Sequence, residues 1–294
     1  MSRVGIVGLG IMGSAYARNA IAGAFEVVGY DIDGDRVRHL GDLGGRAEVS
    51  PAAVAEASDV VLLSLPSVDA LDAVVAGDRG LVHGAGPGLI VVEMGTFPIE
   101  AKLRARLALD EVGATCVDAP VSGTGLQADA AEIVVYASGE PTAVDVVRPV
   151  FDAIAKATFD VGEFGNGSKM KFLANLLVSV HNLVTAETFV LGTAAGLDPE
   201  RILEVISAGV GSSRIFEIRG PMMVADDYPP AARLAMFIKD IGVIGDFARS
   251  LGSPTPLLDA SLPWYEEAVE SGLGDLDAAA LARLLTSKVT RQDY

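Results

Sequence analysis

The stretch that decides the fold is Arg3-Val4-Gly5-Ile6-Val7-Gly8-Leu9-Gly10-Ile11-Met12-Gly13, a short apolar run followed at once by a G-x-G-x-x-G pattern. The apolar run predicts a buried strand, and Met12–Ala22 predicts a helix. In such a strand–turn–helix unit, Gly8 permits the tight turn, Gly10 lets a pyrophosphate approach the backbone, and Gly13 allows close packing. The N–H groups at the start of the helix then face an anion. The stretch therefore predicts dinucleotide binding.

An acidic residue follows at the spacing that this fold requires. Asp31 ends a second strand-like run, Glu26–Tyr30, and lies 18 residues after Gly13, close to the ~20 residues that are typical. A carboxylate there accepts hydrogen bonds from ribose hydroxyls and repels a 2′-phosphate, which favours NAD over NADP. Arg36 and Arg38 lie nearby, either as a solvated helix face or as partners for a phosphate, so NADP stays possible.

Strand and helix patterns alternate as far as residue 162. Continuous Val, Ile and Leu runs indicate strands that are covered on both faces. Their alternation with helical stretches predicts a Rossmann-type, doubly wound and mostly parallel sheet. The later strand-like runs are Asp59–Leu65, Leu89–Glu93, Thr115–Asp118, Glu132–Ser138 and Thr158–Val161. We expect an α/β dinucleotide-binding domain over residues 1–162 and an all-helical substrate and oligomerisation domain over residues 163–294.

The second part of the chain has helical patterns only. They cover Ser168–Ala195, a helix that starts at Asp198-Pro199-Glu200, and the stretches Arg233–Ser250, Leu257–Glu270 and Asp277–Ser287. The first of these contains a long uncharged apolar run, Phe172–Ala186, which is interrupted by polar residues and predicts a buried helix rather than a membrane span. Because this helix is apolar around its circumference, we expect it to pack against a second subunit in a homodimer or homotetramer.

Composition excludes several classes of protein. The 294 residues include 22 Lys and Arg against 39 Asp and Glu, a formal charge of −17, which disfavours binding to nucleic acids or anionic membranes. A small anionic substrate still fits a locally basic pocket. A lone cysteine, Cys116, and three scattered histidines, His39, His83 and His181, predict no disulfide and no metal site. The N-terminus shows no signal peptide, so we expect a cytoplasmic protein.

Four segments in this order form a specific combination. They are Gly8-Leu9-Gly10-Ile11-Met12-Gly13, Asp118-Ala119-Pro120-Val121-Ser122-Gly123, Gly165-Asn166-Gly167-Ser168-Lys169-Met170-Lys171 with Asn175 following, and Lys239-Asp240. With them the chain resembles, over nearly its whole length, the β-hydroxyacid dehydrogenases. That group contains 3-hydroxyisobutyrate dehydrogenase, tartronate semialdehyde reductase and, more distantly, 6-phosphogluconate dehydrogenase.

The resemblance implies which residues meet the cofactor and the substrate. The expected cofactor contacts are Gly8, Gly10, Ile11, Met12, Gly13, Asp31, Leu65, Pro66, Thr96 and Lys239. Ser122 and Gly123 follow a strand end and are expected to hold a substrate carboxylate without adding charge, although Ser-Gly is also common in simple turns. If Lys239 does not contact the cofactor, it is an exposed charged residue on the surface of a helix.

Lys171 is the expected general base of the reaction. Asn175 lies four residues further on, so both side chains project from one helix face, whereas Lys169 points elsewhere. An ordinary lysine pKa, about 10.4, is too high for a base at neutral pH, so burial or the charge of Lys239 has to lower it. Without the family resemblance, a solvated helix lysine is the better interpretation of Lys171. Asn175 orients the substrate in this hypothesis and is otherwise a core amide.

The chain departs from the family pattern around the expected substrate pocket. Thr124, Gln127-Ala128 and Ala131-Glu132 replace glycine-containing positions, Ala174 replaces the first of a tandem Asn pair, and Gly95 replaces a serine before Thr96. These changes leave the identity of the substrate open more than the type of reaction. Arg214 is either a second contact for the anion or an arginine on a helix surface.

The main hypothesis is an NAD(P)-dependent dehydrogenase of a small 3-hydroxy acid, or a reductase of the corresponding semialdehyde. One alternative is an imine reductase, although those enzymes generally lack a lysine at the position of Lys171. A second is a non-catalytic NAD-binding module, since a fold does not by itself imply catalysis. The chain shows no basic cluster for a sugar phosphate.

Overall fold

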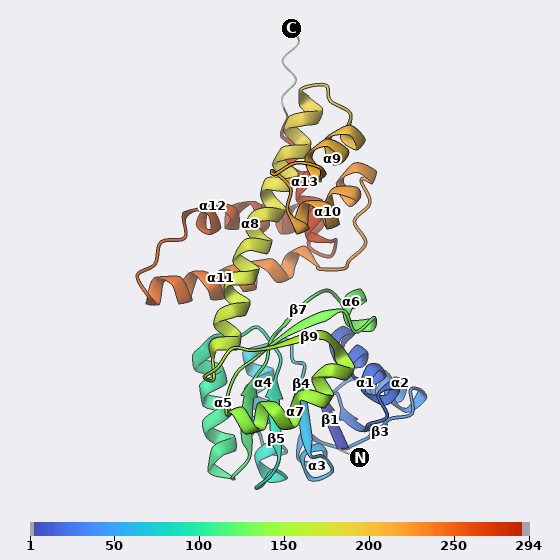
Figure 1. Cartoon of the computed structure of the whole chain (residues 1–294), viewed down its shortest axis with the longest axis vertical. Coiled ribbons are helices and arrows are strands. Elements are labelled where there is room, and N and C mark those ends of the chain that lie inside the picture. The colour runs from blue at the N-terminus through green and yellow to red at the C-terminus, as the bar shows by residue number, and fades with distance from the viewer. Residues whose placement is uncertain (1–2, 290–294) are drawn as a thin grey trace. The chain divides into compact units, whose positions relative to one another are not determined.

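The computed structural model describes residues 3–289, and the chain folds as two compact units, Met1–Lys171 and Phe172–Tyr294. A six-stranded parallel sheet forms the centre of the first unit (Figure 1). Its strands, in spatial order, are β3 (Arg46–Ala47), β2 (Glu26–Tyr30), β1 (Arg3–Val7), β4 (Val60–Leu63), β5 (Ile90–Glu93) and β6 (Thr115–Asp118). This is the doubly wound order 3-2-1-4-5-6, and it confirms the predicted Rossmann fold.

Both faces of the sheet are buried. Val60 and Leu62 of β4 belong to one apolar cluster, and Val61 and Leu63 belong to another, because successive side chains of a strand point to opposite faces. The first cluster is covered by α1 (Ile11–Ala22) and α7 (Pro141–Ile154), with Leu40 of α2 (Gly34–Asp42). The second is covered by α3 (Pro51–Glu56), α4 (Val68–Ala76) and α5 (Ile99–Glu111).

Three more strands make a separate sheet. They are β7 (Val121–Ser122), β8 (Ile133–Ala137) and β9 (Ala155–Asp160), with β7 antiparallel and β9 parallel to β8. The sequence pattern located β8 and β9 but did not separate them from the parallel sheet. After β6 the chain reverses, and an antiparallel bridge joins Asp118 to Ser138. The end of β6 is thereby tied to the end of β8.

The second unit is helical among its described residues. Helix α8 (Asn166–Ala194) begins in the first unit, and α9 (Pro199–Ser207), α10 (Arg214–Ala225), α11 (Leu234–Ser250), α12 (Pro256–Ala268) and α13 (Leu281–Ser287) follow. A π-helical turn, Val269–Leu273, extends α12, and a 3-10 turn, Ala278–Ala280, precedes α13. Asp198 caps α9 by accepting from the backbone N–H of Glu200, as the sequence predicted. Helix α10 was not predicted.

Helix α8 is the one helix within residues 3–289 that is long and apolar enough to span a membrane. A buried amide on this helix is nevertheless bonded inside the second unit. The Asn182 amide donates to Tyr265 and to the carbonyl oxygen of Ala278, and the Tyr265 hydroxyl donates to the carbonyl oxygen of Ser179. Only 33% of its most apolar stretch is buried, however, so the expected burial of this helix is not met within a single chain.

Candidate active site

The glycine loop has the geometry that its spacing predicts. Gly8 has a φ of +91°, and a Cβ there would lie 2.2 Å from the carbonyl oxygen of Ser64. A Cβ on Gly13 would lie 1.8 Å from the carbonyl oxygen of Gly8, so the helix packs directly on the turn. A Cβ on Gly10 would meet only Arg36 Nη1, at 3.7 Å. Gly10 is the N-cap of α1 and provides no side-chain cap, so the first N–H groups of the helix are available to an anion such as a pyrophosphate.

Asp31 lies at the end of β2, beside this loop. Its side chain is 5% exposed, and it accepts hydrogen bonds from the backbone N–H groups of Leu9 at 2.7 Å and Asp33 at 2.9 Å. Arg36 lies 3.5 Å from both Asp31 and Asp33. Asp31 therefore fixes the glycine loop as well as presenting a carboxylate at the strand end, a contact that the sequence did not reveal.

The other expected cofactor residues follow neighbouring strands. Leu65 and Pro66 lie in the loop after β4, and Thr96 lies in the loop after β5. Since β1, β2, β4 and β5 are parallel, their carboxyl ends lie along one edge of the sheet, where ligands bind in open α/β folds. The Leu65 side chain lies 3.3 Å from the Cβ position of Gly8. The first unit thus gathers the glycine loop, Asp31 and these two loops along one edge.

The expected substrate loop is tightly built. Ser122 lies in β7 opposite Val134, and Gly123 has a φ of +150°, with its Cβ position 2.6 Å from Ile133. Helix α6 (Gly125–Asp129) then starts with a capping box in which Thr124 and Gln127 bond to each other's backbone N–H groups. Two departures from the family pattern are therefore coupled, because together they cap one helix.

Helix α8 starts against the ends of β6 and β8. Asp118 accepts hydrogen bonds from the Ser168 backbone N–H at 2.8 Å and from its hydroxyl at 2.9 Å. The Ser138 hydroxyl accepts from the Gly167 N–H at 2.9 Å. These bonds satisfy N–H groups that have no partner within a helix. They fix the turn that leads to Lys171.

Sequence analysis missed a charged cluster behind this turn. Lys102 of α5 is buried between Glu93 and Asp118, at 2.6 and 2.7 Å. The spacing of the sequence could have indicated this cluster. Lys102 lies on the same helix face as the buried residues Ala105 and Leu109, and a lysine on a buried face needs an acidic partner.

Lys171 and Asn175 lie on α8, four residues apart. In the second unit, the Asn175 amide donates to Asp240 Oδ2 at 2.8 Å, and Lys239 pairs with Asp240 Oδ1 at 3.2 Å. Asp240 of α11 therefore connects the expected orienting amide with the expected cofactor-side lysine. Lys169 is exposed and donates to Asn166 at the start of the helix.

The residues that the sequence left ambiguous lie in ordinary structural positions. Cys116 is buried in β6, where burial raises the pKa of its thiol. Tyr265 is buried and stacks on Phe237, with ring centroids 5.3 Å apart. Arg214 is exposed at the first turn of α10 and pairs with Glu217 at 3.1 Å, as expected for an arginine on a helix surface.

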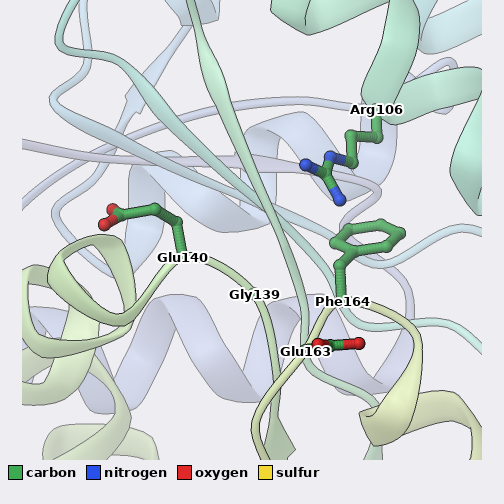
Figure 2. A pocket seen from close by; sticks show the side chains of 5 residues that line it. All are labelled: Arg106, Gly139, Glu140, Glu163 and Phe164. Carbon is green, nitrogen blue, oxygen red and sulfur yellow. The ribbon is translucent and has the colours of Figure 1, made fainter.

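A pocket of about 330 Å³ lies elsewhere in the first unit, lined by Arg106, Gly139, Glu140, Glu163 and Phe164. Figure 2 shows the Arg106 guanidinium facing the Phe164 ring, with Glu140 pointing away from them; the guanidinium carbon lies 5.1 Å from the ring centroid. Arg106 also pairs with Asp110. None of the expected site residues lines this pocket, and its one cation is already paired.

Two family models divide the chain between them. The NAD-binding domain of 6-phosphogluconate dehydrogenase matches residues 3–162, and the NAD-binding domain of NADP-dependent 3-hydroxyisobutyrate dehydrogenase matches residues 165–285. The chain belongs to the β-hydroxyacid dehydrogenase family. It is thus an NAD(P)-dependent oxidoreductase, and the glycine loop described above fits a dinucleotide.

Named members of this family align over almost the whole chain. L-threonate dehydrogenase of Cupriavidus necator is 34% identical over 97% of this chain and 96% of its own length. 2-Hydroxy-3-oxopropionate reductase of Escherichia coli is 28% identical over 96% and 97%. A crystal structure of 3-hydroxyisobutyrate dehydrogenase from Salmonella typhimurium has a TM-score of 0.87 at 30% identity, covering 97% of this chain and 100% of that one.

Imine reductases are more distant from this chain. The enzyme from Bacillus cereus is 18% identical, with a TM-score of 0.64 over 98% of this chain and all of that one. At this identity the likeness shows a shared fold only.

Proposed function

We propose that the protein is an NAD-dependent dehydrogenase of a small 3-hydroxy acid, or a reductase of the corresponding semialdehyde, with Lys171 as the general base and acid. The observation that carries the proposal is the start of α8, where Asp118 and Ser138 hold the first N–H groups. Lys171 follows one turn later, and Asn175 lies on the same face. Bound NAD would supply the acceptor for the hydride that leaves the carbinol carbon.

In this proposal Lys171 Nζ removes the hydroxyl proton during oxidation and returns it during reduction. Asp240 engages one N–H of the Asn175 amide. This fixes the plane of the amide and leaves its oxygen and second N–H to orient the substrate hydroxyl and carboxylate. A substrate that is held in this way needs no further reorganisation before proton transfer.

Ser122 and Gly123 hold the substrate carboxylate. Their backbone is fixed by the β7–β8 pairing and by the Thr124–Gln127 capping box. A hydroxyl and backbone N–H groups can bind one carboxylate without a cation. Such a loop suits a short acid better than a sugar phosphate, whose extra charges call for Arg or Lys.

NAD is favoured over NADP by the charges at the end of β2. Asp31 presents a buried carboxylate, and Arg36 already pairs with Asp31 and Asp33. Arg38 pairs with Asp35, and the exposed side chain after Asp31 is apolar Ile32. Three carboxylates and two guanidinium groups leave this strand end with a net negative charge, which disfavours an added 2′-phosphate. In Asp31→Asn the acceptor for Leu9 persists, so the ratio of NADP to NAD turnover should rise; an unchanged ratio contradicts this assignment.

The relatives named as L-threonate dehydrogenases suggest that the acid is short and hydroxylated. The test is nicotinamide reduction with NAD and NADP across a panel of 3-hydroxy acids and L-threonate, with Lys171→Ala alongside. We expect NAD reduction with one class of acid, and its loss in Lys171→Ala while NAD still binds. Turnover that survives Lys171→Ala would refute the base assignment. NAD binding without turnover of any acid would refute the dehydrogenase proposal.

The protein acts as a homo-oligomer in this proposal, in the cytoplasm and without nucleic-acid or membrane partners. Four exposed apolar residues of α8, Leu173, Leu177, Val184 and Leu191, are spaced by four, seven and seven residues, and so form one stripe along the helix. Burial of this stripe against a second copy would account for its composition. Sedimentation that shows only monomer at micromolar concentration would exclude it.

A further inference from the structure

A buried cluster of three charged side chains lies at the carboxyl ends of β5 and β6. Lys102 Nζ lies 2.6 Å from Glu93 Oε2 and 2.7 Å from Asp118 Oδ1, and the three side chains are at most 1% exposed. Nζ also donates to the carbonyl oxygen of Gly95 at 2.7 Å, while Gly95 N–H donates to Glu93 Oε1 at 2.8 Å. One ammonium group therefore connects two strand ends and the loop that follows β5.

Stability alone does not account for this cluster. Taking ions out of water costs several kcal/mol for each ion, and apolar side chains of similar volume are often as stabilising as a buried ion pair. The cluster also holds two carboxyl groups for one ammonium, and burial raises the pKa of Glu93. Burial acts to lower the pKa of Lys102, but Asp118 and Glu93 outweigh it and raise that pKa. The ammonium is thus held in its charged form, as a fixed three-way link.

Asp118 carries this link to the first turn of α8. Its oxygens accept from the N–H and the hydroxyl of Ser168. The Ser138 hydroxyl, which lies 3.2 Å from Asp118 Oδ2, accepts from the Gly167 N–H. A Cβ on Gly167 would lie 2.3 Å from the carbonyl oxygen of Tyr136. The helix start therefore rests directly on the strand ends, and Asp118 completes its first turn.

The connection has one end at the cofactor loop and the other near the proposed base. The distance between these two parts of the site determines whether hydride and proton transfer can occur together. Gly95, which Lys102 binds, immediately precedes Thr96 in the cofactor loop. Ser168, which Asp118 binds, precedes Lys171 by three residues, or nearly one helical turn. A rotation or slip of the first turn of α8 would displace the Lys171 side chain relative to the cofactor loop.

We propose that Lys102 is a positioning residue that fixes the first turn of α8, and with it Lys171, relative to the cofactor loop at Gly95 and Thr96. The inference rests on the proposed function, in which Lys171 is the base. Lys102 acts through Asp118 and touches no reacting atom. The substrate loop at Ser122 is held separately by its pairing with β8, so loosening the link lowers kcat and changes the KM of the acid little.

The test compares three variants. Lys102→Met removes the ammonium but keeps most of the side-chain volume, and Glu93→Gln/Lys102→Met also removes one of the two carboxylates that would be left unpaired. Lys156→Met, at an exposed position on β9, is the control. For each, we would measure kcat and KM, thermal unfolding, and amide hydrogen exchange at Gly167 and Ser168. Exchange needs no substrate, so it reports on the link even if every acid in the panel fails.

We expect kcat to fall about 10- to 100-fold in both Lys102 variants, as a displacement near 1 Å produces, with the KM of the acid within about threefold. Exchange at Gly167 and Ser168 should be at least about tenfold faster, which corresponds to about 1.4 kcal/mol. The control should match the wild type. A purely structural role predicts a lower Tm with unchanged kcat in the folded protein, and that result would overturn the proposal.

The proposal would also be overturned if the amides of Gly167 and Ser168 exchanged in Glu93→Gln/Lys102→Met at the same rate as in the wild type. If neither Lys102 variant folds, the wild type decides: strong protection of these two amides supports the link, and exchange at the rate of an open loop refutes it. Failure of the proposed function is a separate outcome, seen as turnover in Lys171→Ala or as no turnover in the wild type.

Discussion

Replacing Gly13 by alanine would place a methyl group 1.8 Å from the carbonyl oxygen of Gly8. Real contacts of this kind stay beyond 3.0 Å, so helix and turn must separate by about 1.2 Å at their point of contact. Overpacking of this kind costs about 1–3 kcal/mol. At about 2–4 °C for each kcal/mol in a protein of a few hundred residues, the Tm should fall by several degrees.

The same displacement moves the N–H groups of α1 away from the pyrophosphate. Losing one or two hydrogen bonds to a charged group costs about 1.5–3 kcal/mol each, so the Kd for NAD should rise about 100-fold, or about 2.8 kcal/mol. Calorimetric titration measures this Kd, and differential scanning calorimetry measures the Tm.

Substitutions at two other glycines separate the effect on NAD binding from the effect on stability. Gly10→Ala meets only Arg36 Nη1 at 3.7 Å, so it should weaken NAD binding without lowering the Tm. Gly41 is exposed near the end of α2, and a Cβ there has no atom within 4 Å, so Gly41→Ala should add about 0.5–1 kcal/mol of stability and leave NAD binding unchanged. If Gly13→Ala binds NAD with wild-type affinity, the glycine loop does not form the pyrophosphate site.

Three further perturbations test other parts of the structure. Asp240→Ala frees the Asn175 amide and should lower kcat about tenfold with little change in Tm; unchanged steady-state kinetics would contradict the role given to Asn175. Gln127→Ala removes half of a capping box worth about 1 kcal/mol, so the KM of the acid should rise about fivefold while the Kd for NAD stays constant. Because the pKa of Lys102 is raised above its ordinary value of 10.5, its stabilisation is complete below that pH and is lost as the pH rises further. A Tm series into the alkaline range should therefore fall more steeply for the wild type than for Glu93→Gln/Lys102→Met, and parallel curves would refute the linkage. Because the charge of Glu93 also raises the pKa of buried Tyr16, Glu93→Gln alone is the control for the part of the slope that Tyr16 contributes.

The geometry of the glycine loop could be predicted from sequence because it is local. The three glycines and Asp31 lie within a single strand–helix–strand unit, so their spacing carries both the residue types and their relative positions. The doubly wound parallel sheet followed from the alternation of strand and helix patterns. The short strand β3 was missed because two residues carry no periodicity, and α10 was missed because Gly220 and Pro221 interrupt its pattern.

The charged cluster could not be predicted from spacing. Lys102 lies nine residues from Glu93 and sixteen from Asp118, and Asp118 lies fifty residues from Ser168. Within its own segment, each residue is of a common type: Glu93 and Asp118 are acids at strand ends, Lys102 is a helix lysine, and Ser168 is a serine at a helix start. Only the adjacency of β5 and β6 in the sheet brings the three charges together. Asp240 belongs to a segment that the sequence analysis singled out, but its contact with Asn175 could not be predicted for the same reason, because that contact joins two helices that are distant in sequence.

The Thr124–Gln127 pair gives the departures from the family pattern a physical meaning. Glycines at these positions would leave the loop after Ser122 with many backbone conformations, and substrate binding would have to order it at the cost of entropy. The capping box orders the start of α6 in advance, and the Cβ position of Gly125 lies 2.5 Å from Ile11 Cγ2, so the loop is also held against the glycine loop. A preordered loop pays little entropy on binding the acid that it fits, and it adapts poorly to others. The departures therefore favour a narrow substrate range, and loss of the capping box in Gln127→Ala should raise the KM most for the acid that the wild type prefers.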